Sequence, residues 1–266
     1  HPIIGLIQAN LMLEKISKVK EYMDKIYELR TKIPYFDYIQ FSLQLRLLNA
    51  QNRVGEAYDL IEDSLVKFGE FSESIVLEKF EMLFQMSNIR DAKKAILELY
   101  NRGVKTGQVL ISLSKIYIEY NELDNAKTFL EAYKKSSGET PEYFYYNAKL
   151  ALKKGNNQEA LTSYLKSIAR NRYFISSYYG IVEYYTKEKN WQMASSWADQ
   201  LLSIFSESRG VDYIKLELLF KMGKKEESYK LADKLIAENP YNASLLINVS
   251  FFYWDVANEH KKPIKS

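Results

Sequence analysis

Small and apolar residues recur along this chain with a spacing of about 34 residues. The clearest series consists of small side chains, each 34 or 35 residues after the one before: Ala57, Ala92, Ala126, Ala160, Ala194 and Ser228. A small side chain is needed where two helices cross so closely that a larger one would push their axes apart. One such position in every 34 residues predicts one helical hairpin per repeat, stacked in an array.

Larger apolar side chains keep the same register. One column lies nine residues before the small residues: Leu48, Leu83, Tyr117, Ala151, Tyr185 and Leu219. A second lies four residues after them: Ile61, Ile96, Leu130, Tyr164, Ala198 and Ala232. A third lies seven residues after them: Ser64, Leu99, Tyr133, Ser167, Leu201 and Leu235. Spacings of four and seven place the last two columns on one face of a helix that packs against the preceding helix.

Turn signals separate the predicted helices. Within the repeats they are Gln51–Asn52, Ser87–Asn88, Asn121, Gly155–Asn156–Asn157, Lys189–Asn190 and Gly223. Between the repeats they include Pro34, Gly69, Gly138, Pro141 and Pro240. These residue types favour turns and helix ends. No segment shows the strict alternation of a half-buried strand, so the sequence predicts an all-α fold.

This pattern resembles the tetratricopeptide repeat (TPR). The best match is 141–174, through Phe144, Ala148, Gly155, Ala160 and Tyr164; residues 209–242 match through Gly223, Ser228, Ala232 and Pro240. The family's usual tryptophan in the first helix is absent throughout. The resemblance implies a right-handed superhelical solenoid of antiparallel helix pairs, a single array over 1–266. Its expected parts are 3–37, 38–72, 73–106, 107–140, 141–174, 175–208 and 209–242, with a terminal helix at 243–259.

Composition agrees with a soluble, helix-rich protein. Of 266 residues, 47% are hydrophobic, 27% are charged and five are proline. Charged residues interrupt the longest apolar runs, so no membrane span is expected. The absence of cysteine excludes disulfides and zinc–thiolate sites. Cytoplasmic and exported locations both stay open, and the abundance of Lys, Asn, Ile and Tyr suggests an AT-rich, bacterial genome.

Nothing in the sequence points to catalysis. The only histidines are His1 and His260, near opposite ends, and no phosphate-binding or nucleophile-elbow motif occurs. Carboxylates such as Glu142, Glu183 and Glu217 are expected on solvated helix faces. We therefore predict no enzyme activity, no metal site and no cofactor.

The resemblance implies that first helices line a concave groove. The fifth place of three successive repeats is Tyr145, Tyr179 and Tyr213; the thirteenth is Lys153, Lys187 and Lys221; the ninth is Lys149, Glu183 and Glu217. Tyrosine offers a large contact area with a polar tip, and lysine steers an acidic partner. We therefore predict a protein or peptide partner, which is possibly acidic. The alternative, that the tyrosines pack on neighbouring helices and the lysines form a solvated face, stays open.

Two other kinds of partner, chaperone C-termini and nucleic acids, fit these groove positions less well. The groove positions lack the lysine and asparagine with which family members grip chaperone C-termini. Nucleic acid is disfavoured, because net charge is only +3 and two glutamates share the groove. The run Phe251-Phe252-Tyr253-Trp254 cannot face one side of a helix. Phe251, Phe252 and Trp254 therefore form a possible second interface, for self-association or another chain. The alternative, that this cluster packs inward on the seventh repeat, stays open, and both can hold.

Together these patterns predict a non-catalytic interaction scaffold within a larger assembly. The alternatives are a regulatory repeat segment of a longer protein whose effector domain is absent, and an RNA-binding α-solenoid.

Overall fold

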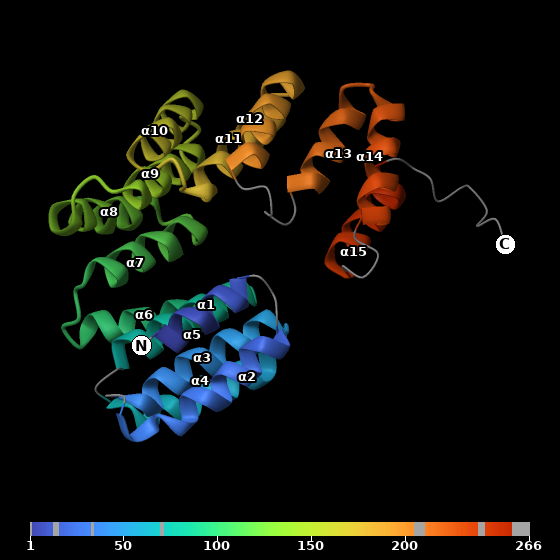
Figure 1. The fold of residues 1–266 in the computed structure, drawn as a ribbon. Helices are drawn as coiled ribbons and strands as arrows, with labels where there is room; N and C mark the ends of the chain where they lie inside the picture. Colours follow the sequence, from blue (N-terminus) through green and yellow to red (C-terminus); the bar gives the residue numbers. More distant parts are fainter. Residues whose placement is uncertain are drawn as a thin grey trace. The chain divides into compact units, whose positions relative to one another are not determined.

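The computed structural model describes residues 2–12, 16–32, 35–69, 72–204, 211–238 and 243–256. Throughout these ranges the regular secondary structure is helical, and the helices follow one another as hairpins (Figure 1). The prediction of an all-α fold of antiparallel helix pairs is confirmed. His1, His260, Pro34 and Pro240 lie outside the described residues.

The chain divides into two compact units, His1–Ile116 and Tyr117–Ser266. The boundary falls inside α7 (Gly107–Glu119). The first unit contains α1 (Pro2–Met12), α2 (Ile16–Glu28), a 3₁₀ turn (Arg30–Lys32), α3 (Phe36–Ala50), α4 (Val54–Lys67), α5 (Ser72–Gln85) and α6 (Ile89–Asn101). The single continuous array over 1–266 stays a prediction.

The second unit continues the alternation. Its helices are α8 (Leu123–Ser137), α9 (Pro141–Lys153), α10 (Asn157–Arg170), α11 (Ile175–Lys187), α12 (Trp191–Ile204), α13 (Val211–Lys221), α14 (Lys225–Glu238) and α15 (Ala243–Phe251), followed by a π-helical turn (Phe252–Val256). Each hairpin packs on the next, as α10 does on α11 and α12 does on α13.

The small-residue series forms the seam of the hairpins. Its members share complete burial: Ala57, Ala92, Ala126, Ala160, Ala194 and Ser228 are all 0% exposed. The columns four and seven residues later are buried in every repeat, and so is the column nine residues earlier except for Tyr185, which is half-buried. The register inferred from spacing is thus the register of the core, because residues at equivalent places meet equivalent neighbours.

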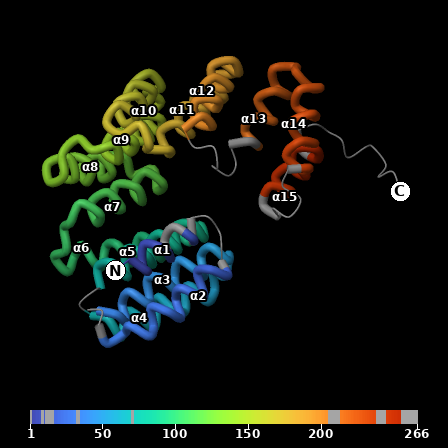
Figure 2. Tube along the Cα trace, viewed as in Figure 1, coloured from blue at the N-terminus to red at the C-terminus, as the bar shows by residue number. Residues whose placement is uncertain are grey.

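The turns inside the hairpins repeat one backbone device. A residue with positive φ occurs in each: Asn52, Ser87, Asn121, Gly155, Lys189 and Gly223. The backbone N–H of the next residue donates to the carbonyl of the predicted apolar column, as Asn156 does to Ala151 at 2.9 Å and Asn190 to Tyr185 at 2.8 Å. This bond closes the end of the first helix in the manner of a Schellman motif. Figure 2 shows the trace doubling back between α9 and α10.

Candidate partner-binding surface

The three predicted tyrosines all take part in packing. Tyr145 on α9, Tyr179 on α11 and Tyr213 on α13 are each half-buried and lie against the core of their own unit. The hydroxyl of Tyr213 donates to Glu217 Oε1 at 3.3 Å, one turn further along α13. Only part of each ring is therefore left to meet a partner.

Tyr145 has the most crowded surroundings. Its ring centroid lies 5.8 Å from that of Tyr164 on α10 and 5.7 Å from that of Phe174, the residue that precedes α11. Burial raises the pKa of the Tyr145 phenol, and the negative charges of Glu183 and Glu119 raise it further. The structure thus brings Tyr145 and Glu183, from successive first helices, into one electrostatic neighbourhood.

The four predicted lysines differ in their surroundings. Lys187 Nζ lies 2.7 Å from Glu183 Oε1, and Lys221 Nζ lies 5.2 Å from the ring centroid of Trp191. Lys149 and Lys153, both on α9, have no ion-pair partner within the described part of the chain. An exposed ion pair partly cancels the field of its lysine, so of these four lysines Lys187 contributes least to the positive potential of this face.

Tyr164 and Gly180 form a close contact that the spacing did not predict. Tyr164 is fully buried, and a Cβ on Gly180 of α11 would lie 2.4 Å from the tip of its ring. Burial also raises the pKa of the Tyr164 phenol, and its hydroxyl has no hydrogen-bond partner among the described residues. The available signal was a glycine in the interior of a predicted helix, where glycine is unfavourable unless space requires it.

The C-terminal aromatic residues divide between core and surface. Phe252 is 0% exposed and its ring lies 6.0 Å from that of Phe220. This corrects its assignment to an exposed interface, since the π-helical turn directs Phe252 into the last repeat. Phe251 and Trp254 are 55% and 62% exposed, and Ile247, one turn earlier, is 55% exposed. Exposed apolar side chains therefore form a stripe that runs from α15 onto the π-helical turn after it.

Two kinds of site are not seen in the described ranges. There, no group of three or more His, Asp or Glu side chains is placed to hold a metal ion. None of the described helices is both long and apolar enough to cross a bilayer. The predicted positions on α9, α11 and α13 offer phenol, ammonium and carboxylate groups beside half-buried rings.

No protein-family model matches the chain, and no curated protein matches its sequence. Solved structures do match its fold. The APC/C hetero-tetramer Cut9–Hcn1 gives a TM-score of 0.60 at 11% identity, covering 93% of this chain and 55% of that chain. A thermophilic TPR protein of Thermus thermophilus gives 0.55 at 13%, covering 67% of this chain and 97% of its own. The chain has the tetratricopeptide-repeat fold.

A further TPR-fold neighbour is PilW, a widely conserved type IV pilus biogenesis factor. It gives a TM-score of 0.58 at 13% identity and covers 78% of this chain and 96% of its own length. At such identities the likeness concerns the fold. The TPR fold places α9, α11 and α13 as first helices of their repeats, which is where Tyr145, Tyr179 and Tyr213 lie.

Proposed function

We propose that this TPR array is a non-catalytic scaffold that binds a protein or peptide partner on its first helices. The observation that carries the proposal is the strip on α9 formed by Tyr145, Lys149 and Lys153. These residues are spaced by four, so they share one face of the helix. The half-buried ring supplies apolar contact, and the two lysines have no internal counter-ion among the described residues.

Two features argue for a protein partner over a nucleic acid. Glu183 and Glu119 stand close enough to Tyr145 to raise its pKa, so a phosphate at this ring would meet two carboxylates. A polyanion gains affinity by neutralising many phosphates, and this strip offers only two uncommitted lysines. The Cut9–Hcn1 neighbour is a hetero-tetramer and PilW is a biogenesis factor, which supports a role within an assembly.

Affinity capture from the source organism tests the proposal. The face variant is Lys149→Glu with Lys153→Glu, and the control is Lys127→Glu with Lys230→Glu on the exposed sides of α8 and α14. Both variants change the net charge equally. We expect an acidic partner to be lost with the face variant and kept with the control, because like charges repel at the strip. Identical capture by both folded variants would contradict the proposal.

A second contact is supported by the exposed stripe of Ile247, Phe251 and Trp254. Exposed apolar side chains in a row are typical of surfaces that another chain covers. We infer self-association through α15, and the same capture experiment reports on it. Untagged copies of the chain should be recovered with the tagged wild type and lost with Trp254→Ser; recovery that is unaffected contradicts it.

The alternatives of a regulatory segment and an RNA-binding array give different capture results. A regulatory segment would be recovered with a single effector protein, and the face variant on α9 would not change that recovery. An RNA-binding array would lose its partners on nuclease treatment.

A further inference from the structure

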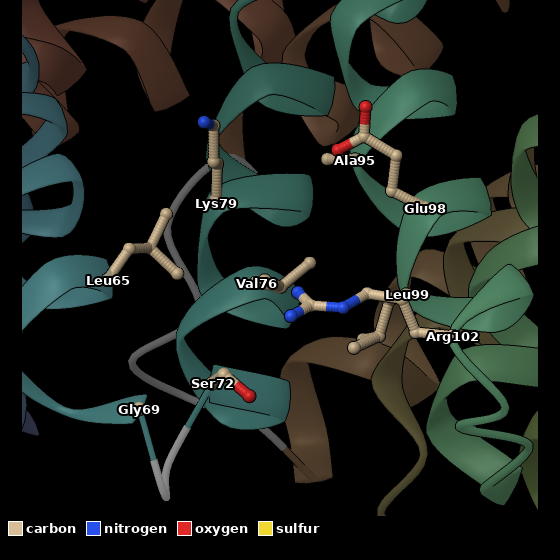
Figure 3. Close-up of a pocket in the computed structure, with 9 residues that line it drawn as sticks. All are labelled: Leu65, Gly69, Ser72, Val76, Lys79, Ala95, Glu98, Leu99 and Arg102. Carbon is tan, nitrogen blue, oxygen red and sulfur yellow. The ribbon is translucent and has the colours of Figure 1, made fainter.

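A pocket in the first unit lies among α4, α5 and α6 (Figure 3). Its volume is about 300 Å³. Its lining exposes more polar than apolar surface, and the apolar part includes half-buried Leu65 from α4 and half-buried Val76 from α5. This volume is at the lower end of the range for ligand sites, so it suits one or two side chains of a peptide.

The charged side chains at the rim of the pocket differ in whether they have an ion-pair partner. Lys79 Nζ lies 2.6 Å from Glu62 Oε1, which neutralises it. Glu98 has only a loose pair, 4.0 Å from Lys94 Nζ. Arg102 is exposed, and its side chain has no ion-pair, hydrogen-bond or ring partner in the described ranges. The Arg102 guanidinium extends across the pocket toward Val76 (Figure 3).

Arg102 has counterparts in other repeats, because a cation ten residues after the seam alanine also occurs at Lys67 and Arg170. Both counterparts have an internal carboxylate. Lys67 Nζ lies 3.4 Å from Asp37 Oδ2, and a guanidinium nitrogen of Arg170 lies 3.2 Å from Glu139 Oε2. The repeat register therefore provides a place for a carboxylate beside this cation.

The repeat of Arg102 lacks a carboxylate at the matching positions. Asp37 lies 20 residues before its seam alanine, and the corresponding residue here is Ser72, which lines the pocket. Glu139 lies 21 residues before its seam alanine, and the corresponding residue here is Phe71. The repeat without a carboxylate at these two positions is thus also the one in which the cation has no partner among the described residues.

We propose that this pocket binds a partner peptide in which a carboxylate lies beside a large apolar side chain. The carboxylate takes the place that Asp37 and Glu139 fill for the counterparts of Arg102, since a guanidinium binds a carboxylate with two parallel hydrogen bonds. The apolar side chain covers Leu65 and Val76. A polyphosphate backbone fits poorly, because its several negative charges would meet Glu98 on the same rim, where Lys79 is already paired with Glu62. This site is separate from the α9 strip.

Fluorescence anisotropy with a synthetic probe tests the proposal. The probe is a fluorescein-labelled peptide, Gly-Ser-Leu-Glu-Phe-Ser-Gly, capped at both ends and titrated with the full chain to about 1 mM. Arg102→Gln should weaken binding about tenfold, because a hydrogen bond to a charged group is lost. Ser72→Asp should weaken it similarly by supplying an internal carboxylate, and Arg102→Lys should lose less than Arg102→Gln.

Matched controls separate the pocket from general charge. Arg90→Gln removes the same charge from the exposed start of α6 and should leave binding unchanged, as should Lys127→Glu with Lys230→Glu in the second unit. A probe with glutamine in place of its glutamate should bind about tenfold more weakly. Loss of the probe with the pair Lys149→Glu and Lys153→Glu would instead place the peptide at the α9 strip and overturn the pocket proposal.

Several outcomes would overturn the proposal. One is absence of binding to the wild type up to the highest concentration, and another is equal loss with Arg90→Gln. Self-association abolished by Arg102→Gln would assign the pocket to a second copy, and displacement of the probe by single-stranded RNA at lower concentration would assign it to nucleic acid.

Discussion

Two repeats in the same register, 73–106 and 141–174, solve the same packing problem with different side chains. Four residues after the seam alanine, the first has Ile96 and the second has Tyr164, and both are fully buried. Isoleucine fills its place without polar atoms. Tyrosine brings a longer ring that reaches the next repeat, where Gly180 makes room for it.

The C-terminal ends of α6 and α10, the second helices of these two repeats, differ in how their cations are paired. Arg170 is held by Glu139 and lies 5.8 Å from the ring centroid of Phe144, whereas the Arg102 side chain has no partner among the described residues. The comparison teaches that the register determines which positions are buried, while residue identity determines which polar groups are left to meet another molecule. In repeat 141–174 the cation, Arg170, is held by Glu139 and packs on Phe144. In repeat 73–106 the cation, Arg102, is left to meet another molecule.

The largest expected effect concerns Gly180. Gly180→Ala places a methyl group against the buried ring of Tyr164, and overpacking of this kind costs about 1–3 kcal/mol. Gly55→Ala is the matched control in the first unit, because a Cβ there meets nothing within 4 Å. The control should gain up to about 1 kcal/mol from better helix propensity. Urea unfolding monitored by circular dichroism measures both.

A double-mutant cycle sharpens the same point. Tyr164→Ile gives the second repeat the residue found at Ile96, so the ring that contacts Gly180 is gone. In that background Gly180→Ala should lose most of its penalty, a coupling of about 1 kcal/mol or more. An unchanged penalty would mean that Gly180 is needed for another reason, and the contrast between the two repeats would fail.

A smaller effect is expected in the turns. Ser87 and Gly155 hold the equivalent place with φ of 59° and 79°. An L-residue is unfavourable in this left-handed region, and glycine is not. Ser87→Gly should therefore stabilise the chain by about 1 kcal/mol, and Gly155→Ser should destabilise it by a similar amount. Thermal unfolding of both variants compares them, and shifts of the same sign would contradict this account.

Much of the fold was predictable because the period of the seam residues is a local pattern repeated many times. Ala160 alone says little, but six equivalent residues in register predict the hairpins, the turns and the buried columns. That the array is one continuous body over 1–266 stays a prediction, and the chain divides into two compact units within α7. Spacing reports on which face a residue occupies and not on distances between repeats.

The candidate surface was predictable only in part, for a physical reason. The spacing placed Tyr145, Lys149 and Lys153 on one helix face, and the structure keeps them there. It could not tell that Lys187 is paired with Glu183, or that Phe252 turns inward, because pairing and a π-helical turn depend on side-chain contacts. The pocket at Arg102 was missed because its signal is an absence. Two other repeats place Asp37 or Glu139 beside the equivalent cation, and this repeat has no carboxylate at the matching positions.

The central claim is that a partner protein contacts the first helices of the second unit. Site-specific photo-crosslinking in cells of the source organism tests it most directly, with a photoreactive side chain in place of Lys153 on α9 or, as the control, of Lys127 on α8. The account predicts a discrete adduct with a partner protein from position 153 and none from position 127. Adducts from position 127 alone, or equal adducts from both, would contradict it.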